Sequence, residues 1–212
     1  MNLISTKFKK YRKDASLFLL SDYEKIRLNK ICKLALFLDT LHAIPATSSN
    51  FSLRSSENSF LISKSGLHKR DLNPTRFVRV DLDGNPLSSL SPRPSDETLL
   101  HALVYKSFPT ANVVAHCHAR EFEKFKTPAH IFAGHELLKA FGFKNHLENF
   151  TLPVFENSQD MAALAEKIGL YLKTNKENNA AFMLERHGIY CFGNSIEQVQ
   201  NYLEALFHLS VL

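Results

Sequence analysis

Segments with helical and strand-like hydrophobic spacing alternate along almost the whole chain, and this alternation restricts the fold more than any other feature. The predicted helices lie at 22–41, from Pro94 to near Pro109, and at 134–141, 160–172 and 196–209, and the predicted strands lie at 60–63, 77–82, 112–119, 150–155 and 180–184. No internal repeat and no Pro/Gly-rich linker separates these segments. Because helices and strands are intermixed, we expect one domain of the α/β or α+β class around a central sheet.

A basic arm is predicted over residues 1–20, ahead of one domain over 21–212. The arm carries five bases within seven positions, namely Lys7, Lys9, Lys10, Arg12 and Lys13. The whole chain has 26 Lys and Arg residues against 21 Asp and Glu residues, which is a mild excess. We interpret the arm as a solvated segment and expect neither a nucleic acid nor a membrane as partner, although attraction to either is the minor alternative.

The number of cysteines and the length of the apolar segments indicate the cellular compartment. Cys32, Cys117 and Cys191 are an odd number without a Cys-x-x-Cys pair, which is not typical of a disulfide framework or a zinc ribbon. No run approaches the roughly 18 apolar residues of a membrane-spanning helix. The stretch 15–20 is too short for the core of a signal peptide. We therefore expect a cytoplasmic protein.

His116 and His118 form the most specific local motif. In a strand, side chains two positions apart point to the same face, so both imidazoles can reach one metal ion while Cys117 faces the other side. A catalytic zinc site needs about three protein ligands and an open position. His187 is the best candidate for the third ligand, because it follows the buried strand-like segment 180–184 and precedes a glycine. The alternative for His187 alone is a hydrogen-bonded loop histidine.

Three loops rich in hydroxyl groups stand at the ends of predicted elements. They are Thr47-Ser48-Ser49-Asn50, Ser63-Lys64-Ser65-Gly66 and Pro94-Ser95-Asp96. The last opens a predicted helix, whose free N–H groups favour an anion such as phosphate. Ordinary turn and cap chemistry is the alternative for each loop. The chain has no P-loop and no Gly-rich dinucleotide motif, which disfavours nucleotide chemistry.

Two glutamates are candidates for a general acid or base. Glu97 lies in the first turn of the helix predicted after Ser95, and Glu136 lies in the stretch Gly134-His135-Glu136-Leu137-Leu138-Lys139. The alternative for each is a solvated charge at a helix end, and the residues alone do not decide between the two roles.

Taken together, these segments resemble the class II aldolase/adducin family, and within it the dehydratases of methionine salvage. The resemblance runs from Ala43 to the C-terminus. The matching segments are Pro45–Ser52, Ser65–Lys69, Val80–Gly84, Arg93–His101, His116–His118, Gly134–Phe141, Val154–Asp160 and Arg186–Gly193. The first loops and the His-x-His motif are common to the family, whereas Glu-Leu-Leu-Lys, Asn-x-Gln-Asp and His-Gly-x-Tyr are typical of the dehydratases.

The resemblance implies an α/β/α sandwich around a mixed, largely antiparallel sheet, with a role for each of several residues. The implied zinc ligands are His116, His118 and His187, the implied acid/base residues are Glu136 and secondly Glu97, and the implied phosphate- or substrate-binding residues are Asn50, Ser65, Gly66, Lys69 and Ser95. One Zn²⁺ per subunit is implied, with another divalent metal as the alternative. Ser49 stands where the family has a glycine, in a turn that favours positive φ.

The implied reaction is the removal of water from a methylthio-substituted ketose phosphate by a homotetramer with active sites at subunit borders. Glu136 would take the proton from C3 and return one to the departing C4 hydroxyl. An aldolase or a 4-epimerase acting on a sugar phosphate is the first alternative, because stabilisation of an enediolate serves all three reactions. A non-catalytic, adducin-like interaction module is the second, although such a module has no need of three histidines and an acid.

Overall fold

The computed structural model describes residues 19–145, 147–175 and 180–211. The strands of these ranges are β1 (Asn50–Ser56), β2 (Ser59–Ser63), β3 (Phe77–Asp81), β4 (Val113–Cys117), β5 (Ala129–Phe132), β6 (Phe150–Phe155), β7 (Ala181–Leu184) and β8 (Gly188–Gly193). The α-helices are α2 (Asp22–Thr40), α3 (Thr98–Ser107), α4 (Met161–Thr174) and α5 (Ile196–Ser210). Short 3-10 helices are η1 (Lys69–Asp71), η2 (Pro74–Arg76), η3 (Arg120–Phe122) and η4 (Glu136–Phe141). Most of the predicted basic arm, residues 1–18, lies outside the described residues.

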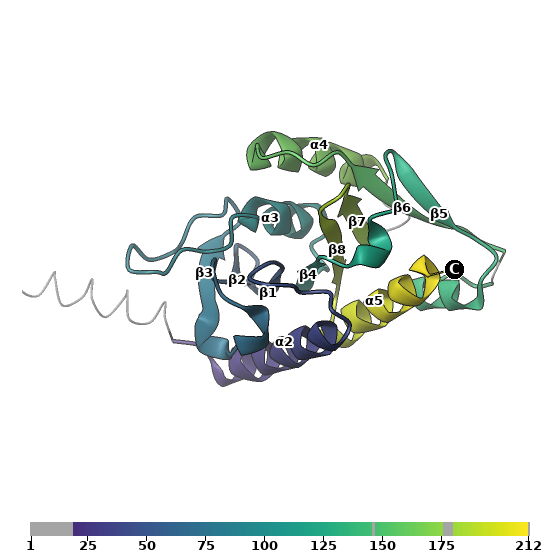
Figure 1. The fold of residues 1–212 in the computed structure, drawn as a ribbon. Coiled ribbons are helices and arrows are strands. Elements are labelled where there is room, and N and C mark those ends of the chain that lie inside the picture. Colours follow the sequence, from purple (N-terminus) through teal and green to yellow (C-terminus); the bar gives the residue numbers. More distant parts are fainter. Residues whose placement is uncertain (1–18, 146, 176–179, 212) are drawn as a thin grey trace, which may run out of the picture.

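The strands form one sheet in the order β3-β2-β1-β4-β8-β7-β6-β5. Neighbouring strands are antiparallel, except for the parallel pair β6 and β7. Helices α2 and α5 cover one face of the sheet, and α3 and α4 cover the other (Figure 1). Since helices cover both faces, the predicted α/β/α sandwich around a mixed, largely antiparallel sheet is confirmed.

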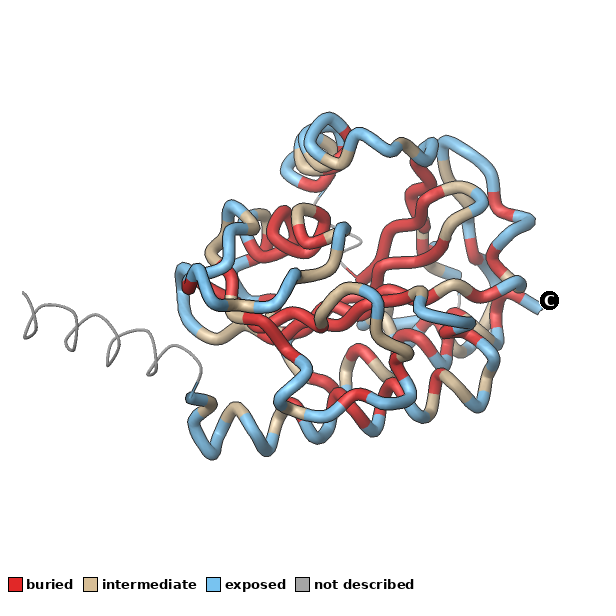
Figure 2. The backbone as a smooth tube through the Cα atoms, turned by 60° about the vertical axis from the view of Figure 1, so that its left-hand side comes forward, coloured by how far each residue is buried: buried red, intermediate tan, exposed pale blue. Residues whose placement is uncertain are grey.

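Each layer of helices packs its own hydrophobic core against the sheet, whose central strands are buried almost throughout (Figure 2). Leu38 of α2 and Leu203 of α5 share one core with Cys117 of β4. Val104 of α3 and Ile168 of α4 belong to the other core. Because side chains alternate along a strand, Cys117 faces α2 and α5 while its neighbour His116 faces α3 and α4, as predicted.

Capping residues explain where the predicted helices begin. Ser21 accepts a hydrogen bond from the N–H of Glu24 in a capping box, and α2 begins at Asp22 as predicted. Helix α3 begins at Thr98 and not at Pro94, because Pro94 forms a β-bridge with Lys64 and a turn follows it, in which the N–H of Thr98 bonds to the carbonyl oxygen of Ser95. The prediction that Pro94 opens this helix is therefore wrong by four residues.

The segment predicted as a helix at 134–141 folds as the 3-10 helix η4. Gly134 and Gly142 both have positive φ, at 69° and 89°, so the regular stretch between them holds six residues. Six residues are fewer than two α-helical turns, and a stretch that short gains little from i→i+4 hydrogen bonds. The sequence patterns also do not predict β1, β5 and β8.

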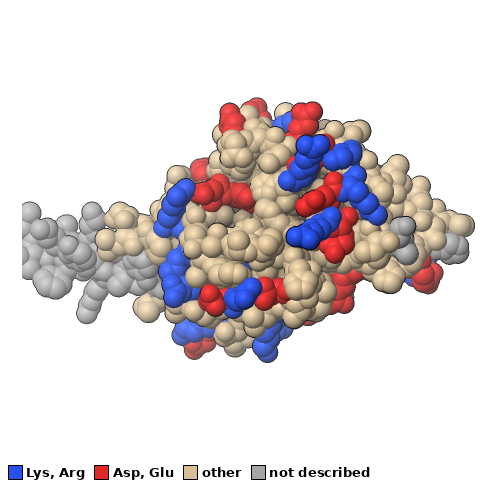
Figure 3. Space-filling model, viewed as in Figure 1, with Lys and Arg blue, Asp and Glu red and all other residues tan. Residues whose placement is uncertain are grey.

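The distribution of charged side chains on the surface is consistent with the mild excess of bases in the sequence. On the face drawn in Figure 3, basic and acidic side chains are interspersed, and the excess of bases forms no continuous patch there. Within the described ranges, none of the helices combines the length and the apolar character that crossing a membrane requires.

Candidate metal centre

The sheet register places three polar residues in one row at the middle of the sheet. Asn50 of β1 is the cross-strand partner of His116 of β4, and His116 is the partner of Tyr190 of β8. Paired residues of antiparallel strands point to the same face, so this row lies on the side of α3 and α4. All three residues are buried.

His116 and His118 point to the same side of β4, and their Nε2 atoms lie 2.8 Å apart. The Nδ1 atom of His116 is 3.0 Å from the carbonyl oxygen of Ile189. A carbonyl oxygen can only accept, so Nδ1 carries the proton and Nε2 presents a lone pair. The buried ring of His116 also stacks on Tyr190, with 4.0 Å between the ring centroids.

His187 reaches the same place from the turn between β7 and β8. Its Nδ1 atom lies 3.1 Å from Oδ1 of Asn157, which can only accept, so a neutral His187 ring would keep its proton on Nδ1 and leave the Nε2 lone pair for a metal ion. The following residue, Gly188, lets the turn come this close. A Cβ at Gly188 would stand 2.4 Å from the carbonyl oxygen of Cys117 and 2.7 Å from Cε1 of His116.

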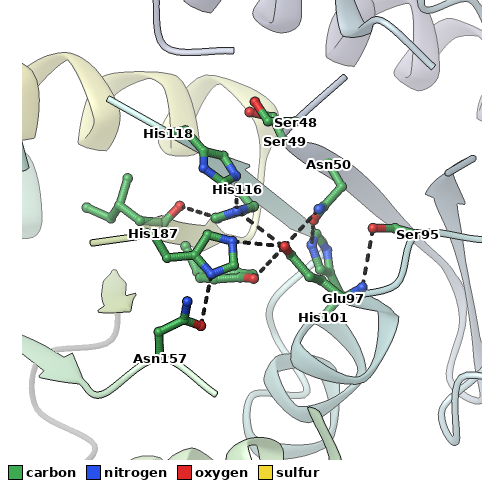
Figure 4. A network of polar contacts seen from close by, with 12 residues as sticks. Ser48, Ser49, Asn50, Ser95, Glu97, His101, His116, His118, Asn157 and His187 are labelled. Atoms are coloured by element: carbon green, nitrogen blue, oxygen red, sulfur yellow. Dashed lines mark hydrogen bonds and ion pairs between the residues drawn. The ribbon is translucent and has the colours of Figure 1, made fainter. Parts of the chain in front are cut away.

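Glu97 is the N-cap residue of α3, yet its carboxylate does not cap the helix. The carboxylate points instead towards the histidines (Figure 4). Its Oε2 atom accepts hydrogen bonds from the Tyr190 hydroxyl at 2.5 Å and from Nδ2 of Asn50 at 2.9 Å. Its Oε1 atom lies 3.0 Å from Nε2 of His187.

This donor set fits a divalent cation such as zinc. The ligand atoms of Glu97, His116, His118 and His187 all lie within 4.8 Å of one another. Lone pairs of imidazole and carboxylate face each other here, which requires a positive charge between them. The outer hydrogen bonds of His116 and His187 orient the rings, as they do around metal ligands in general. Neutral imidazole and carboxylate are ligands that zinc accepts.

Burial and charge keep these groups in the protonation states that a metal needs. Burial and the charge of His187 lower the pKa of His118 to about 4, and burial lowers the pKa of His116 well below its usual value. Burial raises the pKa of the Glu97 carboxyl, but His116 and the hydrogen bonds with its neighbours outweigh burial and hold that pKa well below its usual range. At neutral pH His116 and His118 are therefore neutral, and the carboxylate of Glu97 is ionised.

The three hydroxyl-rich loops lie next to one another beside this centre. Lys69 links the first two, because its Nζ atom donates to the carbonyl oxygens of Thr47 at 3.0 Å and of Leu67 at 2.6 Å. The second and third are linked by the N–H of Ser65, which donates to the carbonyl oxygen of Arg93 at 3.1 Å. Lys69 is 2 % exposed, and burial lowers its pKa to about 8 while the charge of Glu97 opposes that change.

Two loop residues have the left-handed backbone that the sequence suggested for this region. Ser49 has φ of 68° and Gly66 has φ of 70°. Ser49 is thus a non-glycine residue in a conformation that favours glycine. Ser65 and Ser95 are half-buried in the second and third loops, and Ser95 Oγ accepts a hydrogen bond from the N–H of Glu97 at 3.4 Å.

Glu136 is the predicted site residue that the structure places apart from the histidines. It begins η4, pairs with Lys139, and its side chain is 67 % exposed. It is not one of the four residues whose ligand atoms converge. The centre as folded in one chain therefore brings together Glu97 and the three predicted histidines, with Asn50 beside them.

Sequence reasoning assigned no role to three residues that contact this centre. Tyr190 and Asn157 lie in segments that match the family, but their contacts with Glu97 and His187 depend on the pairing of distant strands. His101 is fully buried in α3 and bonds to Asn50. An isolated buried histidine or tyrosine has no local pattern that distinguishes it from a core residue, so the sequence carries no signal for these contacts.

Comparison with known proteins identifies a family and several relatives. The profile described as "Class II Aldolase and Adducin N-terminal domain" matches residues 29–210. Methylthioribulose-1-phosphate dehydratase of Citrobacter koseri is 33% identical over 188 residues, which cover 86% of this chain and 91% of the relative. The protein of the same name from Methylococcus capsulatus is 37% identical over 177 residues, covering 82% and 85%.

Solved structures share the fold at lower identity. YgbL of Escherichia coli superposes with a TM-score of 0.73 at 20% identity, covering 90% of this chain and 89% of YgbL. L-fuculose-1-phosphate aldolase of Thermus thermophilus superposes with a TM-score of 0.69 at 22% identity, covering 87% and 90%. These likenesses establish the fold.

Proposed function

The chain belongs to the class II aldolase and adducin family, and on this premise we propose that it is a metal-dependent methylthioribulose-1-phosphate dehydratase. The substrate would be 5-methylthioribulose 1-phosphate, and the product, after loss of one water, 2,3-diketo-5-methylthiopentyl 1-phosphate. The proposal is supported by relatives of that name that are at least 33% identical and match most of the chain. The observation that carries it is the convergence of three imidazoles and one carboxylate, which fits a lyase that needs a metal.

His116, His118 and His187 are the proposed metal ligands, with Zn²⁺ as the proposed ion. Such an ion would supply Lewis acidity beside the carbonyl group of the substrate. Each of His116 and His187 would carry its proton on Nδ1, where it forms an outer hydrogen bond. The Nε2 lone pair of each ring would then face the centre. The carboxylate of Glu97 lies beside these three rings, where Tyr190 and Asn50 hold it by hydrogen bonds.

Removing water from this substrate requires one group to take the C3 proton and one to protonate the departing C4 hydroxyl. We propose Glu136 for both steps, with Glu97 as the alternative, because both are carboxylates in segments that match the family. A positioned acid or base of this kind contributes about 10²–10⁴ in rate. The exposed position of Glu136, outside the group of four, fits an active site that a second subunit completes.

The three hydroxyl-rich loops are the proposed phosphate site. Asn50, Ser65, Gly66 and Ser95 lie in these loops, and the buried ammonium of Lys69 lies beneath two of them. A positive charge and several hydroxyl groups suit a phosphate dianion. Holding the phosphate there would keep the reacting carbons in register with the metal centre.

The assembly and location proposed with this function follow the family. We propose a homotetramer in the cytoplasm with one Zn²⁺ per subunit, in which residues 21–212 form the catalytic domain and residues 1–20 a solvated basic arm. A sugar phosphate is the proposed small-molecule partner.

The direct test is mass spectrometry of the products formed from 5-methylthioribulose 1-phosphate by metal-loaded protein. A product lighter by one water is expected. Cleavage into two fragments would show an aldolase instead, and unchanged mass with an isomerised substrate would show an epimerase. Unchanged substrate together with a protein that retains no metal would favour a binding module and contradict the proposal.

A further inference from the structure

A line of buried hydrogen bonds leads from Tyr105 of α3 to Glu97 beside the candidate metal centre. The Tyr105 hydroxyl lies 2.7 Å from Oγ of Ser52 in β1, and this Oγ atom lies 2.7 Å from Nδ1 of His101. The Nε2 atom of His101 bonds to Oδ1 of Asn50, and Nδ2 of Asn50 bonds to Glu97 at 2.9 Å (Figure 4). His101 and Ser52 are fully buried, and Tyr105 and Asn50 nearly so.

The direction of every donor in this line follows from the carboxylate at its end. The ionised Glu97 can only accept, so the Asn50 amide turns its NH₂ group to Glu97 and its Oδ1 atom to His101. Since Oδ1 can only accept, the neutral ring of His101 must carry its proton on Nε2. The Nδ1 atom then accepts from the hydroxyl of Ser52, and the remaining lone pairs of Ser52 accept from Tyr105.

We propose that His101 is a positioning residue, whose Nε2–H fixes the Asn50 amide and thereby holds the Glu97 carboxylate against the metal centre. This inference deepens the proposed function and rests on it for the identity of the reaction. Burial lowers the pKa of His101 to about 3, so the ring stays neutral at physiological pH with one donor and one acceptor. Ser52, which itself accepts from Tyr105, donates to Nδ1 of His101 and so also favours the proton on Nε2.

The line is built to orient Glu97 and not to move protons. An amide stands in the middle, and an amide nitrogen does not release its proton at neutral pH. Without the donor of His101, Oδ1 of Asn50 would be buried and unpaired, and the amide would be free to turn its NH₂ group away from Glu97. Outer contacts of this kind are generally worth about 10–100-fold in metal affinity or activity.

The test compares His101→Leu with His101→Gln in the full chain. Leucine has no donor, whereas the glutamine amide can place its NH₂ group near the position of Nε2 and donate to Asn50. With cobalt(II) as the probe metal, His101→Leu is expected to change the visible absorption spectrum and weaken cobalt affinity about tenfold or more. Its kcat on 5-methylthioribulose 1-phosphate should fall about tenfold or more, with KM within about threefold. His101→Gln should restore all three readouts to within about threefold of the unmodified protein.

Val104→Ala is the matched control, because it removes packing from the same helix and no hydrogen bond. It should lower the Tm and leave the cobalt spectrum and kcat unchanged. A cobalt spectrum and affinity unchanged in His101→Leu, equal damage in His101→Gln, or the same spectral change in Val104→Ala would each overturn the inference. The cobalt readout needs no substrate, so an unmodified protein that fails to dehydrate the substrate would overturn the proposed function and leave the positioning result readable.

Discussion

Tyr190 touches the metal centre twice, through its ring and through its hydroxyl. Its ring stacks on His116 at an interplanar angle of 16°, and its hydroxyl donates to Oε2 of Glu97 across 2.5 Å. Burial and the charge of Glu97 both raise the pKa of Tyr190 well above its usual value, so the hydroxyl stays protonated at neutral pH and can donate. One residue therefore contacts both a proposed metal ligand, His116, and the carboxylate of Glu97.

Tyr190→Phe separates these two contacts, because phenylalanine keeps the stacked ring and removes the hydroxyl. We expect metal content to stay normal and kcat to fall about tenfold, since the buried Glu97 carboxylate loses one of its donors. Steady-state kinetics and metal analysis of the same sample check this. Full activity would show that Asn50 alone suffices to hold Glu97.

The metal and the activity should be lost together when a histidine ligand is removed. His118→Ala takes away one of three imidazole ligands, so we expect metal content below about a tenth of normal and activity reduced about 10³-fold. Dialysis against a chelator should have the same effect, reversed by Zn²⁺. His208→Ala, an exposed histidine on α5, is the control and should change neither quantity.

Two glutamine substitutions distinguish the candidates for proton transfer. If Glu136 takes the C3 proton, Glu136→Gln lowers kcat about 10²–10⁴-fold while metal content stays normal. Glu97→Gln, by contrast, is expected to weaken metal binding, since its carboxylate lies among the ligand atoms. Lys139→Met removes the ion-pair partner of Glu136 and is the control that should remain active. Full activity of Glu136→Gln would assign the proton transfer to Glu97.

The His-x-His motif could be predicted because a two-residue period on a strand decides which side chains share a face. The third histidine and the layered fold followed from the order of the segments and from the resemblance to a family. The contacts of Tyr190 and His101 could not be predicted, because they require the register between β1, β4 and β8. That register is a property of distant pairing and leaves no local pattern.

Three strands, β1, β5 and β8, could not be predicted from their local sequence patterns. β8 is buried on both faces over most of its length, so it does not alternate between apolar and polar residues. β1 does alternate, but Phe51 and Leu53 are its only apolar residues, which is too weak a pattern to separate it from the polar loop before it. β1 also carries Asn50 and Ser52, whose polar side chains serve the centre and not the core. β5 is an edge strand of four residues, too short for a period to be visible.

Lys69 is expected to control phosphate affinity more than turnover. Lys69→Met removes the ammonium that links two loops, so we expect KM to rise about tenfold or more with a smaller change in kcat. The pKa of Lys69 is lowered to about 8, so its charge is present at pH 7 and is lost as pH rises through 8. KM of the unmodified protein should therefore rise between pH 7 and 9.5, and this rise should be absent in Lys69→Met.

Glu24 should account for part of the loss of stability in acid. Burial raises the pKa of this carboxyl, but Arg79, Ser55 and the backbone of Ser21 bond to it and lower its pKa to about 2. Glu24 and Arg79 are 12% and 14% exposed, so their ion pair is well shielded from water. A depressed folded pKa stabilises the fold above the usual value of 4.5, and this contribution is lost as pH falls towards 2.

Glu24→Gln should therefore lower the free energy of unfolding by about 2 kcal/mol at pH 7, and the difference should shrink as pH falls below 4.5. Urea unfolding at pH 7, 5 and 3 measures it. The matched control is Asp22→Asn, because Asp22 pairs with Lys25 on the same helix with both side chains exposed, and it should change the free energy of unfolding much less than Glu24→Gln does. An equal cost for the two variants at pH 7, or a difference between Glu24→Gln and the unmodified protein that stays constant down to pH 3, would show that the Glu24–Arg79 pair does not determine acid stability.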